Sequence, residues 1–229
     1  MEPIKTLLLT GENNHDWRAS APFCRDLLAQ SGKFIVTLTE DPSAALEDAA
    51  SLKQYELLFS DYNGPEWSAG AKANFEAAVR SGTGLVVMHA ADNAFPGWVE
   101  YEKMVGLMWR EGTGHGSFHE FPVTIVDRNH PVTQGLSDFR QWDELYHRLV
   151  HMHDVDYHVL ATAYSDPATG GTGQDEPGMV TTGYGAGRIF HQVLGHVWPG
   201  NPDMRAFESD GFQRSLLRGC EWAARGTVA

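Results

Sequence analysis

The alternation of strand-like and helix-like segments over the first ninety residues restricts the fold of this chain more than any other feature. Short β-rich runs lie at residues 6–10, 34–39, 55–60 and 84–88. Helices are predicted between them, from Ser20, from residues 41 to 52, and from Ser68 to about Arg80. The run at 84–88, GLVVM, is apolar on both faces, as expected of a central parallel strand. This order predicts a right-handed, doubly wound α/β sheet.

The second half of the chain is richer in predicted strands than the first. These strands lie at residues 121–126, 158–164, 179–184 and 188–194, and a Gly-Ala-Gly segment makes a hairpin turn between the last two. Residues 165–178 are rich in Gly, Asp, Thr and Pro and are predicted to form a loop. A final helix is predicted at residues 210–225, with Trp222 off its apolar face. Because we find neither an internal repeat nor a linker, residues 1–229 are predicted to form one domain.

The chain is acidic, with 30 Asp and Glu residues against 17 Lys and Arg residues and a formal net charge of -13. This excess argues against nucleic acid or an anionic membrane as a partner. Cys24 and Cys220 lie among apolar residues in predicted helices, so a disulfide framework is not expected. The N-terminal apolar run is too short for a signal peptide, and no stretch approaches the roughly 20 apolar residues of a membrane span. We therefore expect a soluble, cytoplasmic protein.

Polar residues follow three of the predicted parallel strands at the point where each strand ends. His15 follows the first strand, Tyr62 and Asn63 follow the third, and His89 follows the fourth. In doubly wound sheets, ligands bind outside the carboxyl ends of the strands. The chain has 11 histidines, and histidine titrates near neutral pH and commonly ligates metals. The sequence therefore predicts a histidine-rich pocket at this edge of the sheet.

His89 and His196 are the residues from which we expect chemistry first. His89 ends an apolar strand at a sharp strand-to-helix turn, which exposes a side chain as in the nucleophile elbow of other α/β enzymes. His196 closes the sequence RIFHQVLGH and is expected at the same edge, whereas His191, five positions earlier, points to the other side. Both His89 and His196 suit acid–base work or ligation of a metal. The alternative for His89 is a histidine that only hydrogen-bonds a loop.

Two further segments carry titratable side chains. In the sequence DELYH, Glu144 and Tyr146 share one face if the segment is extended. Repulsion between the adjacent carboxylates of Asp143 and Glu144 is expected to raise the pKa of one of them toward a value that suits a general acid or base. The alternative is that the segment is an exposed acidic turn without a catalytic role. His115 and His119 lie four residues apart, but neighbouring glycines argue against a metal-binding helix. A flexible loop that closes over a substrate is the prediction for these two histidines.

Several motifs are missing from the sequence. No G-x-G-x-x-G follows the first strand and no phosphate loop occurs, so no nucleotide cofactor is expected. A G-x-S-x-G motif is also missing, and no cysteine lies at a strand end, so a serine or cysteine nucleophile has no candidate. The imidazole of His15 and the indole of Trp17 suit a sugar-like ligand, although Trp17 suits core packing equally well.

Seven short segments, taken in order, carry a resemblance to a known family. They are GENNHDW, SDYNG, GLVVMHAADNAF, HPVTQGL, DELYH, YGAGRIFHQVLGH and RGCEWAA, and they extend from near residue 7 to near residue 225. Together they resemble the ThuA-like (trehalose utilisation) family within the class I glutamine amidotransferase-like superfamily. The resemblance implies a flavodoxin-like, three-layer α/β sandwich. Its central sheet would be mostly parallel, with helices on both faces and extra β-structure in the C-terminal half.

The same resemblance bears on function. It implies catabolism of trehalose and related disaccharides, an association with keto-sugar intermediates made by sugar dehydrogenases, and a fold that carries metals. In glutamine amidotransferases a cysteine stands at the position that His89 holds here, and its partner histidine resembles His196. The departure at His89 argues against glutaminase activity, and an amidotransferase relative that still hydrolyses amides is the least favoured interpretation.

We therefore expect an enzyme that acts on a disaccharide or an oxidised (keto) sugar, by acid–base or metal-assisted lyase, hydrolase or isomerase chemistry. The predicted catalytic residues are His89, Glu144 and His196. His89 and His196 are also the candidate ligands of one divalent metal, zinc or manganese. The predicted substrate-binding residues are His15, Tyr62, Asn63, His115, His119 and Tyr146. The expected ligand is a small-molecule sugar. A homodimer is compatible with the number of tryptophans and edge strands. The alternative function is a non-catalytic sugar-binding or regulatory module.

Overall fold

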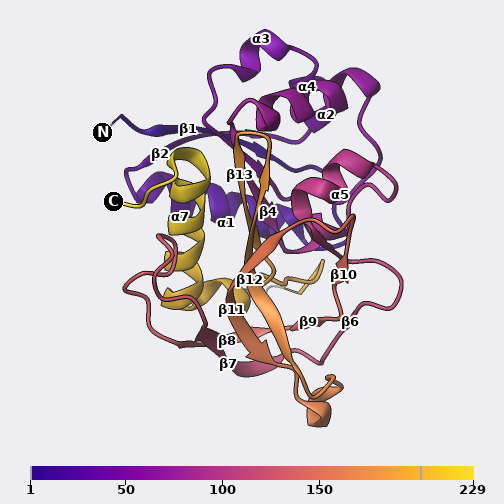
Figure 1. The fold of residues 1–229 in the computed structure, drawn as a ribbon, viewed down its shortest axis with the longest axis vertical. Helices are drawn as coiled ribbons and strands as arrows, with labels where there is room; N and C mark the ends of the chain where they lie inside the picture. The colour runs from indigo at the N-terminus through magenta and orange to yellow at the C-terminus, as the bar shows by residue number, and fades with distance from the viewer. Residues whose placement is uncertain (1, 202) are drawn as a thin grey trace.

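The computed structural model, drawn as a ribbon in Figure 1, describes residues 2–201 and 203–229. Its main element is a nine-stranded sheet with the order β2-β1-β3-β4-β13-β12-β11-β7-β8. The first five strands in this order are parallel, namely β2 (Phe34–Thr39), β1 (Ile4–Leu9), β3 (Leu57–Ser60), β4 (Gly84–Met88) and β13 (Gly187–Gln192). The other four run antiparallel to their neighbours, namely β12 (Asp175–Tyr184), β11 (Tyr157–Tyr164), β7 (His119–Ile125) and β8 (Phe139–Asp143). The sheet is therefore mixed.

Helices cover both faces of the parallel part of the sheet. One face packs against α1 (Trp17–Gln30) and α7 (Asp210–Arg225). The other packs against α2 (Pro42–Leu46), α3 (Ala49–Leu52), α4 (Ala69–Arg80) and α5 (Val99–Val105). Successive side chains of β4 alternate between the two faces, because Val86 belongs to the first core whereas Leu85 and Val87 belong to the second. The predicted flavodoxin-like, three-layer sandwich with extra β-structure in its C-terminal half is confirmed.

Several short elements lie outside these layers. Two small sheets pair β5 (Leu107–Met108) with β10 (Val150–His151) and β6 (Gly114–His115) with β9 (Tyr146–His147). The short helices are η1 (His89–Asn93), η2 (Pro167–Thr169) and α6 (Arg205–Glu208). Among the described residues, no helix has both the length and the apolar character that crossing a bilayer requires.

Two predicted helix boundaries differ from the observed ones. Helix α1 begins at Trp17 and not at Ser20, because the backbone N–H of Ser20 already donates to the carbonyl of Asp16 at 3.0 Å. The segment predicted as one helix forms two, α2 and α3, because two aspartates cap separate helical turns. Asp41 accepts the N–H of Ala44, and Asp48 accepts that of Ala50.

The predicted loop at residues 165–178 is shorter than expected, because β12 begins at Asp175. The pairing of β12 with β11 begins at Asp175, which pairs with Tyr164. It includes Pro177, which pairs with Thr162. The register of β11 shifts on both sides of Ala161, directly before the residue that pairs with this proline. Such an irregularity accommodates a residue without an N–H donor, so long-range pairing overrides the local composition.

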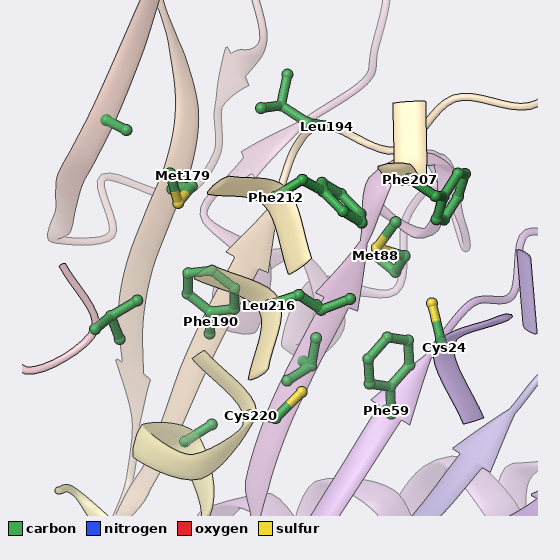
Figure 2. Packing of buried hydrophobic residues seen from close by; sticks show 14 of the residues in the cluster. Cys24, Phe59, Met88, Met179, Phe190, Leu194, Phe207, Phe212, Leu216 and Cys220 are labelled. Carbon is green, nitrogen blue, oxygen red and sulfur yellow. The ribbon is translucent and has the colours of Figure 1, made fainter. Parts of the chain in front are cut away.

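Helix α7 has the bounds that the sequence predicts, and Figure 2 shows its apolar face against the sheet. The buried residues of this face include Phe212, Leu216 and Cys220. At Gly219 a Cβ atom would lie 2.1 Å from the ring of Phe190, so glycine permits the close approach of α7 to β13. Trp222 is partly buried against the core, and its ring also packs against that of His130, with centroids 4.8 Å apart. The two cysteines are free and buried.

Candidate active site

Three histidines from three separate loops meet at the carboxyl edge of the parallel strands. His15 lies between β1 and α1, His89 begins η1 directly after β4, and His196 follows β13. One ring nitrogen of each lies within 4.8 Å of one ring nitrogen of the others, and all three side chains are buried. Because β1, β3, β4 and β13 are consecutive in the sheet, loops that are far apart in the sequence meet here. We call His15, His89 and His196 the histidine cluster.

His89 has a backbone conformation that is uncommon for a residue with a side chain. Its φ of +43° lies in the left-handed region, where Cβ crowds the following carbonyl. This conformation falls at the junction of β4 and η1 and resembles the strained turn of a nucleophile elbow. The Nδ1 atom lies 2.6 Å from the carbonyl oxygen of Val193. Because a carbonyl only accepts, Nδ1–H donates to it, and the Nε2 lone pair faces Nδ1 of His196 at 3.3 Å.

The backbone at His196 is held by the buried carboxyl group of Asp143. This group accepts hydrogen bonds from the N–H of Gly195 at 2.7 Å, of His196 at 3.3 Å and of Glu144 at 2.9 Å. Burial raises the pKa of Asp143 to about 7, and the backbone N–H donors act in the opposite direction. Gly195 has a φ of +121°, and a Cβ there would lie 2.0 Å from Cε of Met88. Asp143 therefore ties His196 to Glu144, and glycine lets this loop approach the end of β4.

The spacing of the histidine cluster matches that of metal ligands. Nε2 of His15 lies 3.0 Å from Nδ1 of His196, and Nε2 of His89 lies 3.3 Å from the same atom. Nitrogen ligands 2.0–2.1 Å from a tetrahedral metal are separated by about 3.3 Å. Two of the three separations therefore already suit ligands of one cation, and all three nitrogens lie within 4.8 Å of one another.

The hydrogen bonds of His15 also leave its Nε2 without a proton. Its Nδ1 lies 3.2 Å from Oδ1 of Asn14, which also accepts a hydrogen bond from Nδ2 of Asn63 at 2.7 Å. Nδ1–H of His15 thus donates to Asn14, and its Nε2 lone pair, like that of His89, faces Nδ1 of His196. A proton or a cation has to lie among these nitrogens to offset the repulsion of their lone pairs. Imidazole nitrogens held by such outer partners are typical ligands of a divalent metal, so the donor set fits one.

Burial keeps the three imidazoles uncharged. It lowers the pKa of His15 to about 4 and that of His196 to about 3, and it holds the pKa of His89 well below its ordinary value. Neighbouring imidazoles, including that of His115, lower these pKa values further because like charges repel. At neutral pH the histidine cluster is therefore in the form that ligates metals and accepts protons.

A cavity of about 130 Å³ opens beside the histidine cluster, and we call it the first cavity. Its lining consists of Asn14, His15, Ala90, Asn93, Trp109, His115, Glu144, Tyr146 and Trp198. This volume is below the roughly 300–1,000 Å³ of pockets for drug-sized ligands, so a small ligand fits it better. Two tryptophans and several hydrogen-bonding groups in one lining match the apolar faces and hydroxyl groups of a sugar.

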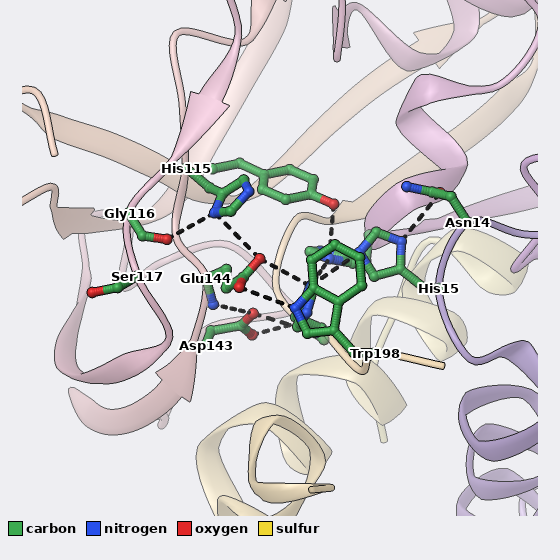
Figure 3. A network of polar contacts seen from close by, with 12 residues as sticks. Asn14, His15, His115, Gly116, Ser117, Asp143, Glu144 and Trp198 are labelled. Carbon is green, nitrogen blue, oxygen red and sulfur yellow. Dashed lines mark hydrogen bonds and ion pairs between the residues drawn. The ribbon is translucent and has the colours of Figure 1, made fainter. Parts of the chain in front are cut away.

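Glu144 lines the first cavity together with His15, and Figure 3 shows its carboxylate next to His115 and Trp198. Its Oε1 accepts a hydrogen bond from the indole N–H of Trp198 at 3.2 Å. Its Oε2 lies 3.2 Å from Nδ1 of His115 and 3.5 Å from Nδ1 of His196. On the other side of the cavity, the hydroxyl of Tyr146 lies 2.8 Å from Nε2 of His89 and donates to it. A carboxylate, a phenol and imidazoles therefore border one small space.

The structure brings most of the predicted site residues together and places others elsewhere. His115 and Tyr146 line the first cavity, and Asn63 contacts it through Asn14. Tyr62 lies outside the lining, because its hydroxyl donates to the carbonyl of Pro65 and its ring stacks on a neighbouring aromatic core. His119 also lies outside, because its Nδ1 bonds the nearby carbonyl of Ser117 and its ring lies beside Phe121.

Two tryptophans of the first cavity were not predicted. Trp198 comes two residues after His196, so its place beside a predicted site residue was a usable signal. Trp109 follows the two-residue strand β5 and carries no comparable signal. His191, predicted to point away, lies outside the histidine cluster with its Nε2 3.4 Å from Oδ2 of Asp92.

Asp61, at the end of β3, predicts a specific pH dependence of stability. It is 4% exposed, and burial raises its pKa to about 7 although Ser20 and Asn13 donate hydrogen bonds to it. Because the folded-state pKa lies above the unfolded value, its contribution to stability is complete below the unfolded pKa and is lost as pH rises through about 7. Each unit of pKa difference is worth roughly 1.4 kcal/mol, so the loss is expected to reach a few kcal/mol.

Urea denaturation of the wild type and Asp61→Asn from pH 4 to pH 8 measures this effect. The free energy of unfolding of the wild type is expected to fall relative to that of the variant as pH rises from the unfolded pKa of 3.8 to about 7, and to level off above that pH. Asp156→Asn, at an exposed position, is the control and is expected to follow the wild type. Parallel curves for the wild type and Asp61→Asn would show that Asp61 titrates as it does in the unfolded chain.

Comparisons with known proteins agree with this architecture. A solved ThuA-like protein from Parabacteroides merdae is 37% identical, with a TM-score of 0.90 over 100% of this chain and 92% of that one. A ThuA-like protein from Bacteroides uniformis is 20% identical, with a TM-score of 0.73 over 96% of this chain and 91% of that one. The CTPS glutaminase domain of Trypanosoma brucei shares the fold, at 11% identity and a TM-score of 0.55 over 99% of this chain and 95% of that one. No curated protein matches the sequence at a significant level.

The family described as trehalose utilisation, ThuA, matches residues 5–223, which is almost the whole sequence. The glutaminase domain supports the predicted amidotransferase-like fold, although it says nothing about activity at its low identity. The family description indicates a role in carbohydrate metabolism. From its sequence and its fold, this chain belongs to the ThuA (trehalose utilisation) family.

Proposed function

We propose that the protein is an enzyme of carbohydrate catabolism that acts on a keto derivative of a sugar by metal-assisted acid–base chemistry. One observation carries this proposal: three uncharged, buried imidazoles meet at a small cavity, and the carboxylate of Glu144 borders both. A module that only binds sugar has no need of such a group of titratable side chains. The family description supports a carbohydrate as the ligand.

The residues that would hold the metal are His15, His89 and His196. Catalytic zinc sites have three protein ligands, and the three-histidine set is one of the known forms. Zinc or manganese, when bound, would supply a Lewis acid that polarises an oxygen of the sugar. The Val193 carbonyl and the Asn14 side chain fix the ring tautomers of His89 and His15. Asp143 holds the backbone of His196 in place.

Glu144 is the proposed proton carrier. A keto group acidifies the neighbouring C–H bond, so one positioned carboxylate suffices to remove that proton. The protonated carboxyl group then returns the proton, either to a leaving oxygen in an elimination or to a neighbouring carbon in an isomerisation. The indole N–H of Trp198 holds one of its oxygens, which directs the carboxylate toward the cavity. When Nε2 of His89 holds the metal, the hydroxyl of Tyr146 loses this acceptor and would instead donate a hydrogen bond to a sugar oxygen from the other side of the cavity.

The test is product formation by the purified protein after it is loaded with zinc or manganese and desalted. Keto derivatives of glucose and trehalose are incubated with loaded and with chelator-treated protein, and products are followed by NMR. We expect turnover by the loaded protein and little by the treated protein. Saturable binding of these sugars without any product, with either preparation, would instead identify a non-catalytic sugar-binding module.

A further inference from the structure

His191 and Asp92 form a buried pair to which the proposed chemistry gives no role. The two side chains are 1% and 0% exposed, and Nε2 of His191 lies 3.4 Å from Oδ2 of Asp92. Within the described part of the chain, no other polar group bonds either side chain. Because an unpaired charge is costly to bury, each of these side chains depends on the other for a partner.

The pair connects the two segments that carry His89 and His196. Asp92 belongs to η1, which begins with His89. His191 belongs to β13, which leads to His196. In a 3₁₀-helix residues three apart lie on the same face, so the side chains of His89 and Asp92 leave η1 in one direction. On that side, Nδ1 of His89 lies 2.6 Å from the carbonyl oxygen of Val193, two residues after His191. Two contacts, one turn apart, therefore hold η1 to β13 and to the residue that follows it.

The backbone of His89 is strained and has to be held by its surroundings. A φ of +43° persists in a residue with a side chain only where neighbouring structure fixes it. Part of this support reaches the carbonyl groups of η1. The hydroxyl of Tyr101 donates to Ala91 at 2.9 Å, and the N–H of Trp109 donates to Asp92 at 3.2 Å. These contacts hold η1 to α5 and to the segment after β5, whereas the side chain of Asp92 holds it to the sheet.

We propose that Asp92 and His191 are positioning residues that act on the histidine cluster through His89. They hold η1 against β13, so that Nε2 of His89 stays opposite Nδ1 of His196. The strand register supports this role, because His191 pairs with Val87, two residues before His89, on the neighbouring strand β4. This proposal rests on the proposed function, because it takes the histidine cluster as the reacting centre.

Two substitutions of His191 separate positioning from packing. His191→Gln keeps an amide that donates or accepts a hydrogen bond near the place of the imidazole Nε2. His191→Phe keeps a ring in the core and removes every hydrogen-bonding group. If the imidazole only fills space, His191→Phe is the milder change, and if it positions η1, His191→Gln is the milder change. The two roles therefore predict opposite orders for the same two variants.

Nitrogen-15 NMR of the imidazoles, in protein free of metal and sugar, measures the placement of His89. In the wild type we expect one tautomer, with Nδ1–H donating to Val193 and Nε2 accepting from Tyr146 at 2.8 Å. His191→Gln is expected to keep this tautomer. In His191→Phe the two nitrogen signals of His89 are expected to move toward each other, because the second tautomer mixes in when η1 is released. His158→Phe, in an exposed pair with an aspartate, is the control and is expected to match the wild type.

The dissociation constant for zinc, measured by competition with a chelator, gives a second readout on the same samples. It is expected to rise about 10- to 100-fold in His191→Phe, as for loss of an outer partner of a metal ligand, and to stay close to the wild-type value in His191→Gln. A wild type that binds no zinc would count against the proposed function alone, because the NMR result does not depend on a metal.

His191→Phe leaves Asp92 buried without a partner, so a variant that keeps the core apolar is needed in case it does not fold. Asp92→Leu combined with His191→Phe replaces both polar groups, a change that is often tolerated. This double variant is expected to fold and still to lose the single tautomer of His89. Wild-type signals of His89 in folded His191→Phe or in the double variant would overturn the proposal, and so would an unchanged zinc dissociation constant in both.

Discussion

The wild-type protein is expected to carry a divalent metal at close to one ion per chain, and replacing His196 by alanine is expected to remove it. His196 supplies the nitrogen that both other members of the cluster face, at 3.0 and 3.3 Å. Loss of an outer-shell partner alone weakens metal binding about 10- to 100-fold, and loss of a direct ligand is expected to cost at least as much. Elemental analysis of protein purified without an affinity tag measures this effect, before and after loading with zinc or manganese.

Two comparisons make this result specific. His15→Ala is expected to lose the metal as His196→Ala does, whereas His158→Ala, on an exposed strand position, is expected to keep it. Circular dichroism of each variant shows whether it is folded. If folded His196→Ala carries as much metal as the wild type, the histidine cluster is not the metal site. If the wild type takes up no metal even after loading, the three imidazoles act as acid–base or binding groups instead.

Glu144→Gln is expected to lower kcat about 10²–10⁴-fold, the usual contribution of a general acid or base. The amide keeps the shape of the side chain and still accepts the Trp198 hydrogen bond, but it carries no proton for transfer. KM and metal content are expected to stay close to those of the wild type. Steady-state kinetics on the keto sugar that the wild type converts, with elemental analysis of the same samples, test both expectations.

Glu176→Gln is the matched control, because Glu176 and Glu144 are each 8% exposed. The Glu176 carboxylate accepts hydrogen bonds from Thr172 and from the backbone of Arg148, and it does not line the first cavity. A kcat for Glu144→Gln within a few-fold of the wild type would exclude Glu144 as the proton carrier. Loss of metal from Glu144→Gln would make Glu144 a ligand of the metal.

The position of the site could be predicted from the sequence, whereas its composition could only be predicted in part. His15, His89 and His196 each follow a strand whose apolar run is visible in the sequence, and parallel strands end at one edge. The direction of a loop side chain depends on contacts with residues that are near it only after folding. Trp109 enters the first cavity, whereas His119 bonds its own loop and lies outside it.

The sequence alone determined the parallel α/β core, the bounds of β4 and α7, and the edge at which the histidines gather. These features follow from apolar periodicity and caps, which are properties of neighbouring residues. Only the tertiary structure decided that β12 begins at Asp175, that Asp143 holds the loop of His196, and that Trp198 and Glu144 line the first cavity. Each of these features depends on a pairing or a hydrogen bond between distant parts of the chain, and local periodicity contains no information about such contacts.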